Sequence, residues 1–286
     1  MKAYVYGANG AAITEVAKPS PKGTQVLVRV RACGLNRADL GMTKGHAHGS
    51  AGGAGTVLGM EWAGEIAEVG PDARGVKVGD KVMGSGSAAF AEYTLADHGR
   101  LFRTPSNMNF EEACTLPIAV PTMHNAVVTV GALQPGQAVL IQGASSGVGL
   151  MALQIAKLKG ARLVIGSSTD ATRRARLKEF GADLAVDSSD PGWVDQVLQA
   201  TAGEGVDLIV DQVSGKVASQ NLKATKIKGR IVNVGRLGGT HADFNFDLHA
   251  ARRINYIGVT FRTRTIEEIR EIFDEVRKDI WPAVES

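Results

Sequence analysis

Apolar residues along the chain change their spacing near residue 109, and the change separates two kinds of structure. Before it, short apolar runs alternate with turn sequences such as Pro21-Lys22-Gly23 and Val78-Gly79-Asp80. Runs of this kind between turns are typical of β-strands. The predicted strands are Lys2–Tyr6, Gln25–Ala32, Gly64–Val69, Lys81–Met83 and Ala89–Leu95. We expect a helical turn at residues 34–42 and a glycine-rich loop at residues 43–56.

Beyond residue 109, helical and strand patterns alternate. Residues 111–130 read as one or two helices interrupted by Pro117 and Pro121. The predicted strands that follow are 138–142, 161–167, 183–187, 206–211, 229–235 and 254–261. The predicted helices are 147–159, 170–180, 192–202, 214–226, roughly 246–252, and an amphipathic helix over Thr265–Ile280. This alternation predicts an α/β protein with a doubly wound, parallel six-stranded sheet.

The stretch from Ala138 to Gly160 carries the most specific local pattern of this second half. A buried strand is followed by the turn Gly143-Ala144-Ser145-Ser146-Gly147-Val148-Gly149 and then by a helix. Strand, glycine turn and helix form the first half of a dinucleotide-binding βαβ unit, in which the backbone approaches a pyrophosphate. Ser145 breaks the usual G-x-G-x-x-G spacing. A glycine turn alone is therefore a weak signal, and the rest of the chain has to decide.

Composition narrows the class of protein. The chain has 286 residues, enough for two domains, with 44% hydrophobic and 21% charged residues, as in a folded globular protein. The net charge of +3 comes from dispersed Lys and Arg, so we expect no nucleic-acid partner and no membrane-binding face. Two distant cysteines, Cys33 and Cys114, favour a reducing compartment. No apolar run has the length of a signal peptide or a membrane span, which predicts a cytoplasmic protein.

Five motifs follow one another along the chain. They are Cys33-Gly-Leu-Asn36-Arg-Ala-Asp39, Leu58-Gly-Met-Glu61-Trp-Ala-Gly64-Glu-Ile-Ala-Glu-Val-Gly70, Val78-Gly-Asp-Lys-Val82, Ala89-Phe-Ala-Glu-Tyr93 and the turn Gly143–Gly149. Their order and spacing resemble the medium-chain dehydrogenase/reductase superfamily, and within it the zinc-free quinone oxidoreductase branch that includes zeta-crystallin. The resemblance implies a GroES-like β domain at 1–118 and a Rossmann domain at 119–264, with the active site in the cleft between them. Residues 265–286 are expected to return to the first domain, and members of the family continue beyond this point with a further strand and helix.

The same resemblance bears on metal binding. Zinc-dependent members of the superfamily place a cysteine where this chain has Asn36 and a histidine where it has Met60. An amide and a thioether cannot replace a thiolate and an imidazole as zinc ligands, so we expect no metal. His46 and His48 lie in the glycine-rich loop, where they could hold a metal only opportunistically. Without a Lewis acid, acceptors that spread negative charge are favoured, namely quinones or conjugated enones and enals.

The residues after the second strand of the βαβ unit distinguish NADPH from NADH. NAD-specific proteins carry a carboxylate there, whereas this chain has Ser167 and Ser168, whose hydroxyls can donate to a 2′-phosphate. The resemblance places Arg173 on that phosphate, and Ser188 where relatives often have a stacking tyrosine. NADPH is therefore the expected cofactor. The other expected cofactor-binding residues are Thr122, Gly143, Ala144, Ser145, Ser146, Gly147, Val148, Val213, Val234, Gly235, Phe261 and Arg264.

The expected catalytic residues lie in the first half of the chain. By resemblance, Asn36 occupies the vacant zinc-ligand position, where its amide can donate a hydrogen bond to the substrate oxygen. Asp39 would orient Asn36 or a lysine, with a helix cap as the alternative role, and Lys44 matches a basic position often seen there. Glu61 is expected to be structural. The family often has a tyrosine a few residues after Asp39, where this chain has Gly41 and Met42, so we expect the proton to come from solvent.

Three functions remain open from the sequence. The first is an NADPH-dependent reductase of quinones or of conjugated enones and enals. The second is an enoyl-thioester reductase that resembles the enoyl reductase modules of polyketide synthases, with residues 43–56 lining an acyl channel. The third is a cofactor-binding structural protein, as some crystallins of the family are. The family also implies a homodimer joined through an edge strand such as 254–261.

Overall fold

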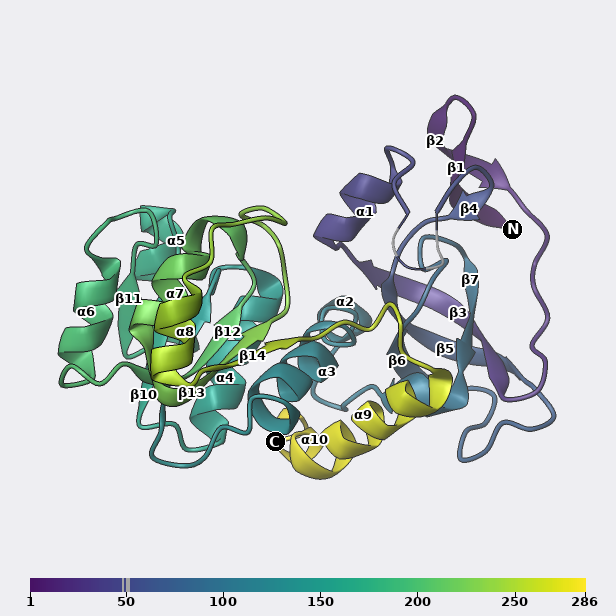
Figure 1. The fold of residues 1–286 in the computed structure, drawn as a ribbon. Helices are drawn as coiled ribbons and strands as arrows, with labels where there is room; N and C mark the ends of the chain where they lie inside the picture. The colour runs from purple at the N-terminus through teal and green to yellow at the C-terminus, as the bar shows by residue number, and fades with distance from the viewer. Residues whose placement is uncertain (48, 50–51) are drawn as a thin grey trace. The chain divides into compact units, whose positions relative to one another are not determined.

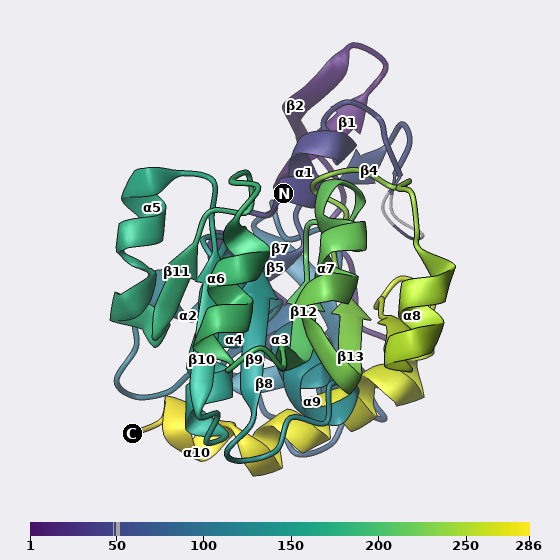
Figure 2. The same cartoon turned by 60° about the vertical axis from the view of Figure 1, so that its left-hand side comes forward.

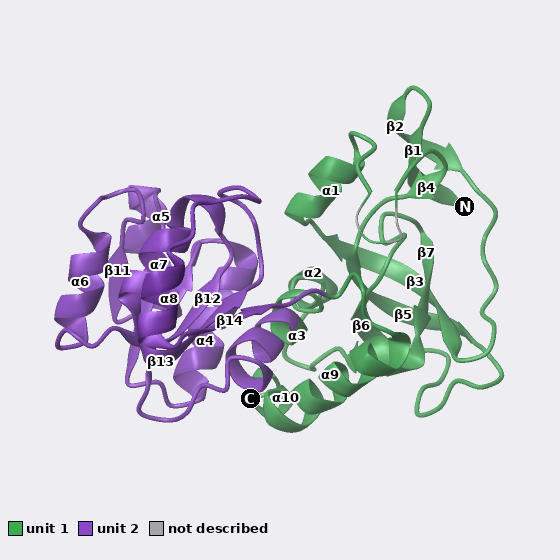
Figure 3. Cartoon of the chain, in the orientation of Figure 1, with its two compact units in different colours: residues 1–121, 261–286 green, residues 122–260 purple. Residues whose placement is uncertain are grey.

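The computed structural model describes residues 1–47, 49 and 52–286, so His48, Ser50 and Ala51 of the expected glycine-rich loop lie outside the described residues. The chain divides into two units (Figure 3). The first consists of Met1–Pro121 together with Phe261–Ser286, and the second consists of Thr122–Thr260. Each unit has its own hydrophobic core.

The first unit is built on antiparallel strands (Figure 1). Its larger sheet has five strands in the order β7-β3-β5-β6-β8, and its smaller sheet has three in the order β2-β1-β4. The larger sheet contains β3 (Gln25–Gly34), β5 (Glu61–Val69), β6 (Lys81–Ser85), β7 (Tyr93–Asp97) and β8 (Leu101–Arg103). The smaller sheet contains β1 (Lys2–Gly7), β2 (Gly10–Glu15) and β4 (Thr56–Val57). Alternate side chains of the larger sheet, among them Val26, Val28 and Trp62, are buried in the core.

Three strands of this unit were not predicted, because their pattern is weak. The strand β2 carries small and polar residues, and Ile13 in it is 75% exposed, so its pairing with β1 defines it rather than any apolar periodicity. The strands β4 and β8 have only two and three residues. The strand predicted at 89–95 lies at 93–97, since the amides of Ala89 and Phe90 bond to Gly59 and Leu58 instead.

Short helices and one long helix complete the first unit. They are α1 (Arg37–Met42), a 3₁₀ turn (His98–Arg100), α2 (Phe110–Ala113), α9 (Ile266–Asp279) and α10 (Trp281–Val284). The helix α3 (Ala119–His124) crosses into the second unit and continues as a π-helical turn (Asn125–Thr129). The helix α9 is fixed by an ion pair of 2.6 Å between Arg270 and Asp97 and by stacking of Phe273 on Phe102, with ring centroids 4.6 Å apart.

The second unit is a parallel six-stranded sheet in the order β11-β10-β9-β12-β13-β14, which confirms the predicted fold class. Its strands are β9 (Ala138–Gln142), β10 (Leu163–Ser167), β11 (Leu184–Val186), β12 (Val206–Asp211), β13 (Thr225–Asn233) and β14 (Asn255–Gly258). The central strand β9 is buried along its whole length, as its unbroken apolar run predicts. The direction of strand succession reverses between β9 and β12, which is where ligands bind in sheets of this type.

The helices of the second unit lie beside this sheet (Figure 2). They are α4 (Gly147–Leu158), α5 (Ala171–Ala175), α6 (Trp193–Ala200), α7 (Ala218–Ala224) and α8 (Phe246–Arg252), with 3₁₀ turns at Leu177–Phe180 and Gly215–Val217. The helix predicted at 214–226 ends at Ala224, because Thr225 is already extended and starts β13. The strand predicted at 254–261 ends at Gly258. Both corrections concern boundaries, where a local pattern is least informative.

Candidate active site

The glycine turn joins β9 to α4 in a conformation that requires its glycines. Gly143 has φ +73°, which side-chain-bearing residues rarely adopt. A Cβ at Gly149 would lie 2.6 Å from the Gly143 carbonyl oxygen, so helix and strand pack here without a side chain between them. At Gly147 no atom lies within 4 Å of such a Cβ, which leaves the first turn of α4 open. Ser146 caps α4 by accepting a 3.1 Å hydrogen bond from the Gly149 amide. This turn fits a dinucleotide pyrophosphate.

Around the turn, the expected phosphate-binding side chains fall into two groups. Ser168 donates a 2.9 Å hydrogen bond to Ser145, which joins the end of β10 to the turn. Arg173 lies exposed on α5, and Ser188 lies half-buried after β11. Ser167 differs from these: it is 0% exposed, donates to Gln142 Oε1 at 2.6 Å and accepts from the Gly143 amide at 3.0 Å. Its hydroxyl therefore supports the turn from inside, which corrects the expected contact with a 2′-phosphate.

Arg174, the neighbour of Arg173 on α5, holds this helix to the sheet. Its guanidinium donates to the Ser168 carbonyl oxygen at 2.7 Å and to Asp187 at 2.9 Å. These bonds connect α5 to the ends of β10 and β11. Arg173 carries no such bond to Asp187, so the two neighbouring arginines play different parts in the structure.

The other expected cofactor residues are spread over several loops. Val213 follows β12, and the amides of Val234 and Gly235 after β13 both donate to the Asp211 carbonyl oxygen, at 2.8 and 3.1 Å. Ala144 is buried in the turn, Val148 is in α4, and Thr122 is half-buried in α3. Phe261 and Arg264 follow β14, which ends at Gly258, and lie in a turn assigned to the first unit, with the Arg264 guanidinium 5.8 Å from the Phe261 ring.

In the first unit, Asn36 and Glu61 form a hydrogen-bonded pair. Asn36 precedes α1, and its Nδ2 donates to Glu61 Oε1 at 2.8 Å. The second oxygen of Glu61 accepts from the Ile118 amide at 3.0 Å. A Cβ at Gly34 would lie 2.6 Å from Glu61 Oε1, so a glycine at this position gives the carboxyl group its space. Asp39 accepts from the Asn36 amide at 2.7 Å, which makes it a helix cap that also holds the Asn36 backbone.

Glu61 has an unusual pKa for a glutamate side chain. It is 4% exposed. Burial raises the pKa of Glu61 to about 7; the hydrogen bonds from Asn36 and Ile118 work against this shift, and the negative charge of Asp39 adds to it. Sequence reasoning assigned Glu61 a structural role and missed this property. The sequence signal that was available is an acidic residue within an otherwise apolar strand start.

Lys44 lies exposed in the turn after α1, while Asn36 and Asp39 are joined at the start of that helix. The donor set at this site does not suit zinc, because Asn36 and Met60 stand where a thiolate and an imidazole are needed. Among the residues that the structure describes, no group of three or more His, Cys, Asp or Glu is placed to hold a metal ion.

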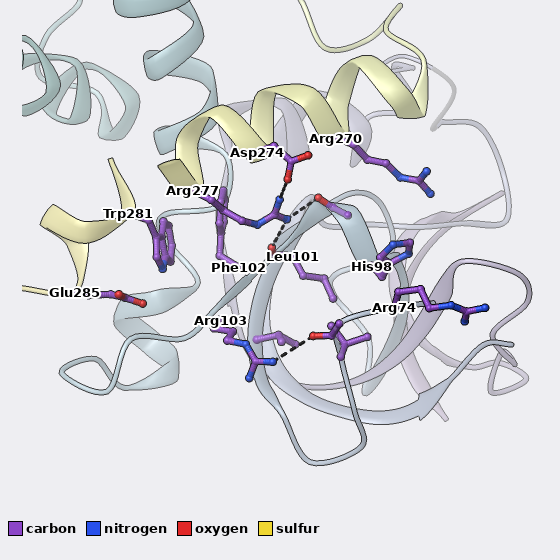
Figure 4. A pocket seen from close by; sticks show the side chains of 14 residues that line it. Arg74, His98, Leu101, Phe102, Arg103, Arg270, Asp274, Arg277, Trp281 and Glu285 are labelled. Atoms are coloured by element: carbon purple, nitrogen blue, oxygen red, sulfur yellow. Dashed lines mark hydrogen bonds and ion pairs between the residues drawn. The ribbon is translucent and has the colours of Figure 1, made fainter. Parts of the chain in front are cut away.

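A separate hollow of about 490 Å³ lies in the first unit between α9 and the sheet (Figure 4). Two of the arginines that line it form hydrogen bonds or ion pairs within the first unit. Arg277 donates to the carbonyl oxygens of Gly99 and Leu101 at 2.7 and 2.8 Å, and Arg103 pairs with Asp80 at 3.3 Å. Trp281 stacks on Phe102 at its rim, with ring centroids 4.2 Å apart. We assign Arg277 and Trp281 to the docking of α9 and α10, whereas the Arg103–Asp80 pair joins β8 to the residue before β6.

Comparisons with known proteins agree with this architecture. Residues 22–106 match the family model for the alcohol dehydrogenase GroES-like domain, and residues 147–278 match that for zinc-binding dehydrogenase. A mouse protein named quinone oxidoreductase-like protein 2 is 32% identical over 250 residues, which cover 86% of this chain and 71% of the mouse protein. Human quinone oxidoreductase is 29% identical over 260 residues, which cover 90% of this chain and 78% of the human one.

Two further matches extend the comparison. A phenolphthiocerol/phthiocerol polyketide synthase of Mycobacterium tuberculosis is 33% identical over 240 residues, which cover 83% of this chain but only 11% of the synthase. The solved structure of mycobacterial Rv1454c complexed with NADPH superposes with a TM-score of 0.83 at 25% identity, over 98% of this chain and 89% of that one.

The chain belongs to the medium-chain dehydrogenase/reductase superfamily, a class of nicotinamide-dependent oxidoreductases, and within it to the quinone oxidoreductase family. Among the described residues, no helix has both the length and the apolar character needed to cross a membrane.

Proposed function

We propose that the protein is an NADPH-dependent, zinc-independent reductase of quinones or of conjugated enones and enals. The observation that carries this proposal is the pairing of Asn36 with Glu61 at the position of the zinc ligands in zinc-dependent relatives. The pair replaces a Lewis acid with a fixed hydrogen-bond donor. Such a donor suffices when the acceptor delocalises the negative charge.

In this account the chain positions the acceptor and stabilises its charge. A reduced nicotinamide, when bound, supplies a hydride. The Asn36 amide has two hydrogens; Glu61 accepts one, and the second is available for the acceptor oxygen on which negative charge develops. Glu61 fixes the orientation of that amide, and Asp39 fixes its backbone. The proton that completes the reduction comes from solvent. Lys44 contributes positive charge near this segment.

The cofactor site in the proposal is the glycine turn with the loops around it. The open first turn of α4 receives the pyrophosphate, and Ser145, Ser168 and Arg173 face the 2′-phosphate. Val213, Val234 and Gly235 line the nicotinamide side, with Thr122 bonding the carboxamide or ribose. The mycobacterial relative solved with NADPH supports the choice of cofactor.

A second candidate is an enoyl-thioester reductase. Two observations favour it: the identity to the mycobacterial polyketide synthase, and the apolar side chains next to Asn36. Leu35 is 85% exposed and Leu40 is 64% exposed, so they offer a surface for an acyl chain. The reduced bond is again conjugated to a carbonyl group, so the role of Asn36 is the same.

An acceptor panel distinguishes these functions. NADPH oxidation is followed with a quinone, an enone, an enal and crotonyl-thioester at equal concentrations. We expect the quinone or the conjugated carbonyl to have the highest kcat/KM. A preference for the thioester replaces the first proposal by the second, whereas NADPH binding without turnover of any acceptor indicates a structural, crystallin-like protein.

We further propose a cytoplasmic homodimer joined at the edge strand β14. This strand ends the sheet order, and aromatic residues gather beside it: Phe246 is 75% exposed and Tyr256 is 37% exposed. Sedimentation is expected to give a dimer that dissociates on Tyr256→Lys. A monomer at high protein concentration refutes the proposal.

A further inference from the structure

A row of buried polar side chains crosses the carboxyl edge of the parallel sheet. Ser167 ends β10, Gln142 ends β9 and Asp211 ends β12, and these three strands are neighbours. Asp211 pairs in register with Gln142. These three residues and Asn221 of α7 are all 0% exposed. Polar groups buried this completely need partners within the protein.

The partners form one continuous chain of hydrogen bonds. Asn221 Nδ2 donates to Asp211 Oδ2 at 3.0 Å, and Gln142 Nε2 donates to Asn221 Oδ1 at 2.8 Å. Ser167 Oγ donates to Gln142 Oε1 at 2.6 Å, and the Gly143 amide donates to Ser167 Oγ at 3.0 Å. The chain thus leads from a carboxylate on β12 to the first residue of the glycine turn.

The carboxylate determines the direction of every bond in this chain. An ionised Asp211 can only accept, so Asn221 turns its NH₂ group toward it and its oxygen toward Gln142. Gln142 is oriented in the same sense by Asn221. Ser167 then gives its single hydrogen to Gln142, and its lone pair faces the Gly143 amide. Each orientation follows from the one before it.

Asp211 also holds the two other loops from which the proposed cofactor residues come. Its Oδ1 accepts from the amides of Val213 and Ser214 at 2.8 and 2.9 Å. Ser214 has φ +57°, a conformation that non-glycine residues rarely adopt and that needs such support. The Asp211 carbonyl oxygen accepts from the amides of Val234 and Gly235.

We propose that Asp211 is a positioning residue that sets the affinity for the nicotinamide cofactor by fixing the glycine turn through this chain of side chains. The inference rests on the proposed function, in which the turn holds the cofactor pyrophosphate. Asp211 acts through other groups, and its carboxylate is fully enclosed by protein. The pKa of Asp211 is raised by burial, and the hydrogen bonds from Ser214, Val213 and Asn221 oppose this shift.

An exchange of the residues at positions 211 and 221 tests the direction of these hydrogen bonds. In Asp211→Asn, the new amide must donate toward Asn221, which reverses the amides and leaves the Ser167 hydrogen without its acceptor. We expect the Kd for NADPH to rise about tenfold, as for a buried polar group that loses its partner.

In the double variant Asp211→Asn/Asn221→Asp, the carboxylate introduced at position 221 accepts from both neighbours, so the bonds from Gln142 to Gly143 keep their direction. We expect its Kd to return to within about twofold of the wild type. A double variant as weak as the single one overturns the proposal.

A milder pair of variants separates positioning from general stability. Ser167→Ala removes one buried hydroxyl of the chain. Thr201→Val removes another buried hydroxyl of the same unit, which bonds to Val197 and Gly205 before β12 begins. We expect both variants to lower Tm and only Ser167→Ala to weaken NADPH binding, by about fivefold. Equal Kd values in both variants overturn the inference, and this comparison can still be interpreted if Asp211→Asn does not fold.

A wild-type protein that binds neither NADPH nor NADH refutes the proposed function and this inference with it. Cofactor binding that no variant changes refutes the inference alone.

Discussion

Glu61 in the first unit and Asp211 in the second are both buried carboxyl groups, yet their surroundings differ. Glu61 accepts two hydrogen bonds, has the acidic Asp39 nearby, and its pKa is raised to about 7. Asp211 accepts three hydrogen bonds through its carboxylate; burial raises its pKa as well, and these hydrogen bonds and the positive charge of Arg236 oppose the shift. The two buried acids thus differ in the number of donors they accept from and in the sign of a neighbouring charge.

The difference has a functional meaning. Glu61 changes its charge near neutral pH beside the residue we propose to contact the acceptor. The carboxylate of Asp211 accepts from three donors, which favour its ionised form against the effect of burial, and it anchors the loops of the proposed cofactor site. The first group makes the proposed acceptor site sensitive to pH, whereas the second serves the proposed cofactor site through the hydrogen bonds it accepts.

The largest effect we expect is the pH dependence of stability due to Glu61. Because its folded pKa of about 7 exceeds the ordinary value of 4.5, the folded protein binds this proton more tightly than the unfolded chain. The free energy of unfolding therefore falls as pH rises from 4.5 to 7, by about 3 kcal/mol from this group. In Glu61→Gln this fall is absent. Denaturant unfolding between pH 4.5 and 8 measures it, and parallel curves for the two proteins contradict the environment assigned to Glu61.

The next effect concerns the acceptor. Asn36→Ala removes the proposed hydrogen-bond donor, so we expect kcat to fall about a hundredfold. Asn109→Ala is the matched control, because Asn109 also precedes a short helix of the same unit and caps it, with Oδ1 2.8 Å from the Glu112 amide. It should cost about 1 kcal/mol of stability and leave kcat unchanged. If both variants keep the wild-type kcat, Asn36 has no role in the reaction.

A smaller effect is expected on the affinity for NADPH. Arg173→Ala should raise the Kd for NADPH about tenfold and leave that for NADH unchanged, because only NADPH carries the 2′-phosphate. Arg176→Ala is the control, since that guanidinium is exposed and paired with Glu179 at 3.0 Å. Fluorescence titration of both variants with NADPH and with NADH gives the four dissociation constants. An equal loss for NADPH and NADH removes Arg173 from the phosphate site.

The parallel sheet was the most predictable part of the fold, because its central strand is buried along its whole length and reads as an apolar run. The strand Ala138–Gln142 is found at its predicted bounds. The strands β2 and β8 were not predicted, since pairing with β1 and with β6, and no apolar pattern of their own, makes them strands. The junction at Thr225, where a helix passes directly into a strand, has no turn sequence to mark it.

Some residues of the candidate site were also predictable from the sequence, and others were not. The glycine turn and Asn36 were identified from local patterns and from the resemblance. The inward orientation of Ser167 and the role of Asn221 were not, because both depend on which residues of three separate strands lie side by side. The same holds for Glu61, whose burial depends on contacts with Asn36 and Ile118 that are distant in sequence.

The reaction that we propose for this protein is hydride transfer from NADPH to a conjugated acceptor without a metal ion. Its most direct test uses NADPH deuterated at the nicotinamide C4 position and an enone, with and without a chelator, and analyses the product by mass spectrometry and NMR. We expect deuterium on the β-carbon of the product and the same rate with the chelator. Loss of the rate on chelation with recovery on added zinc, or a product without deuterium, contradicts it.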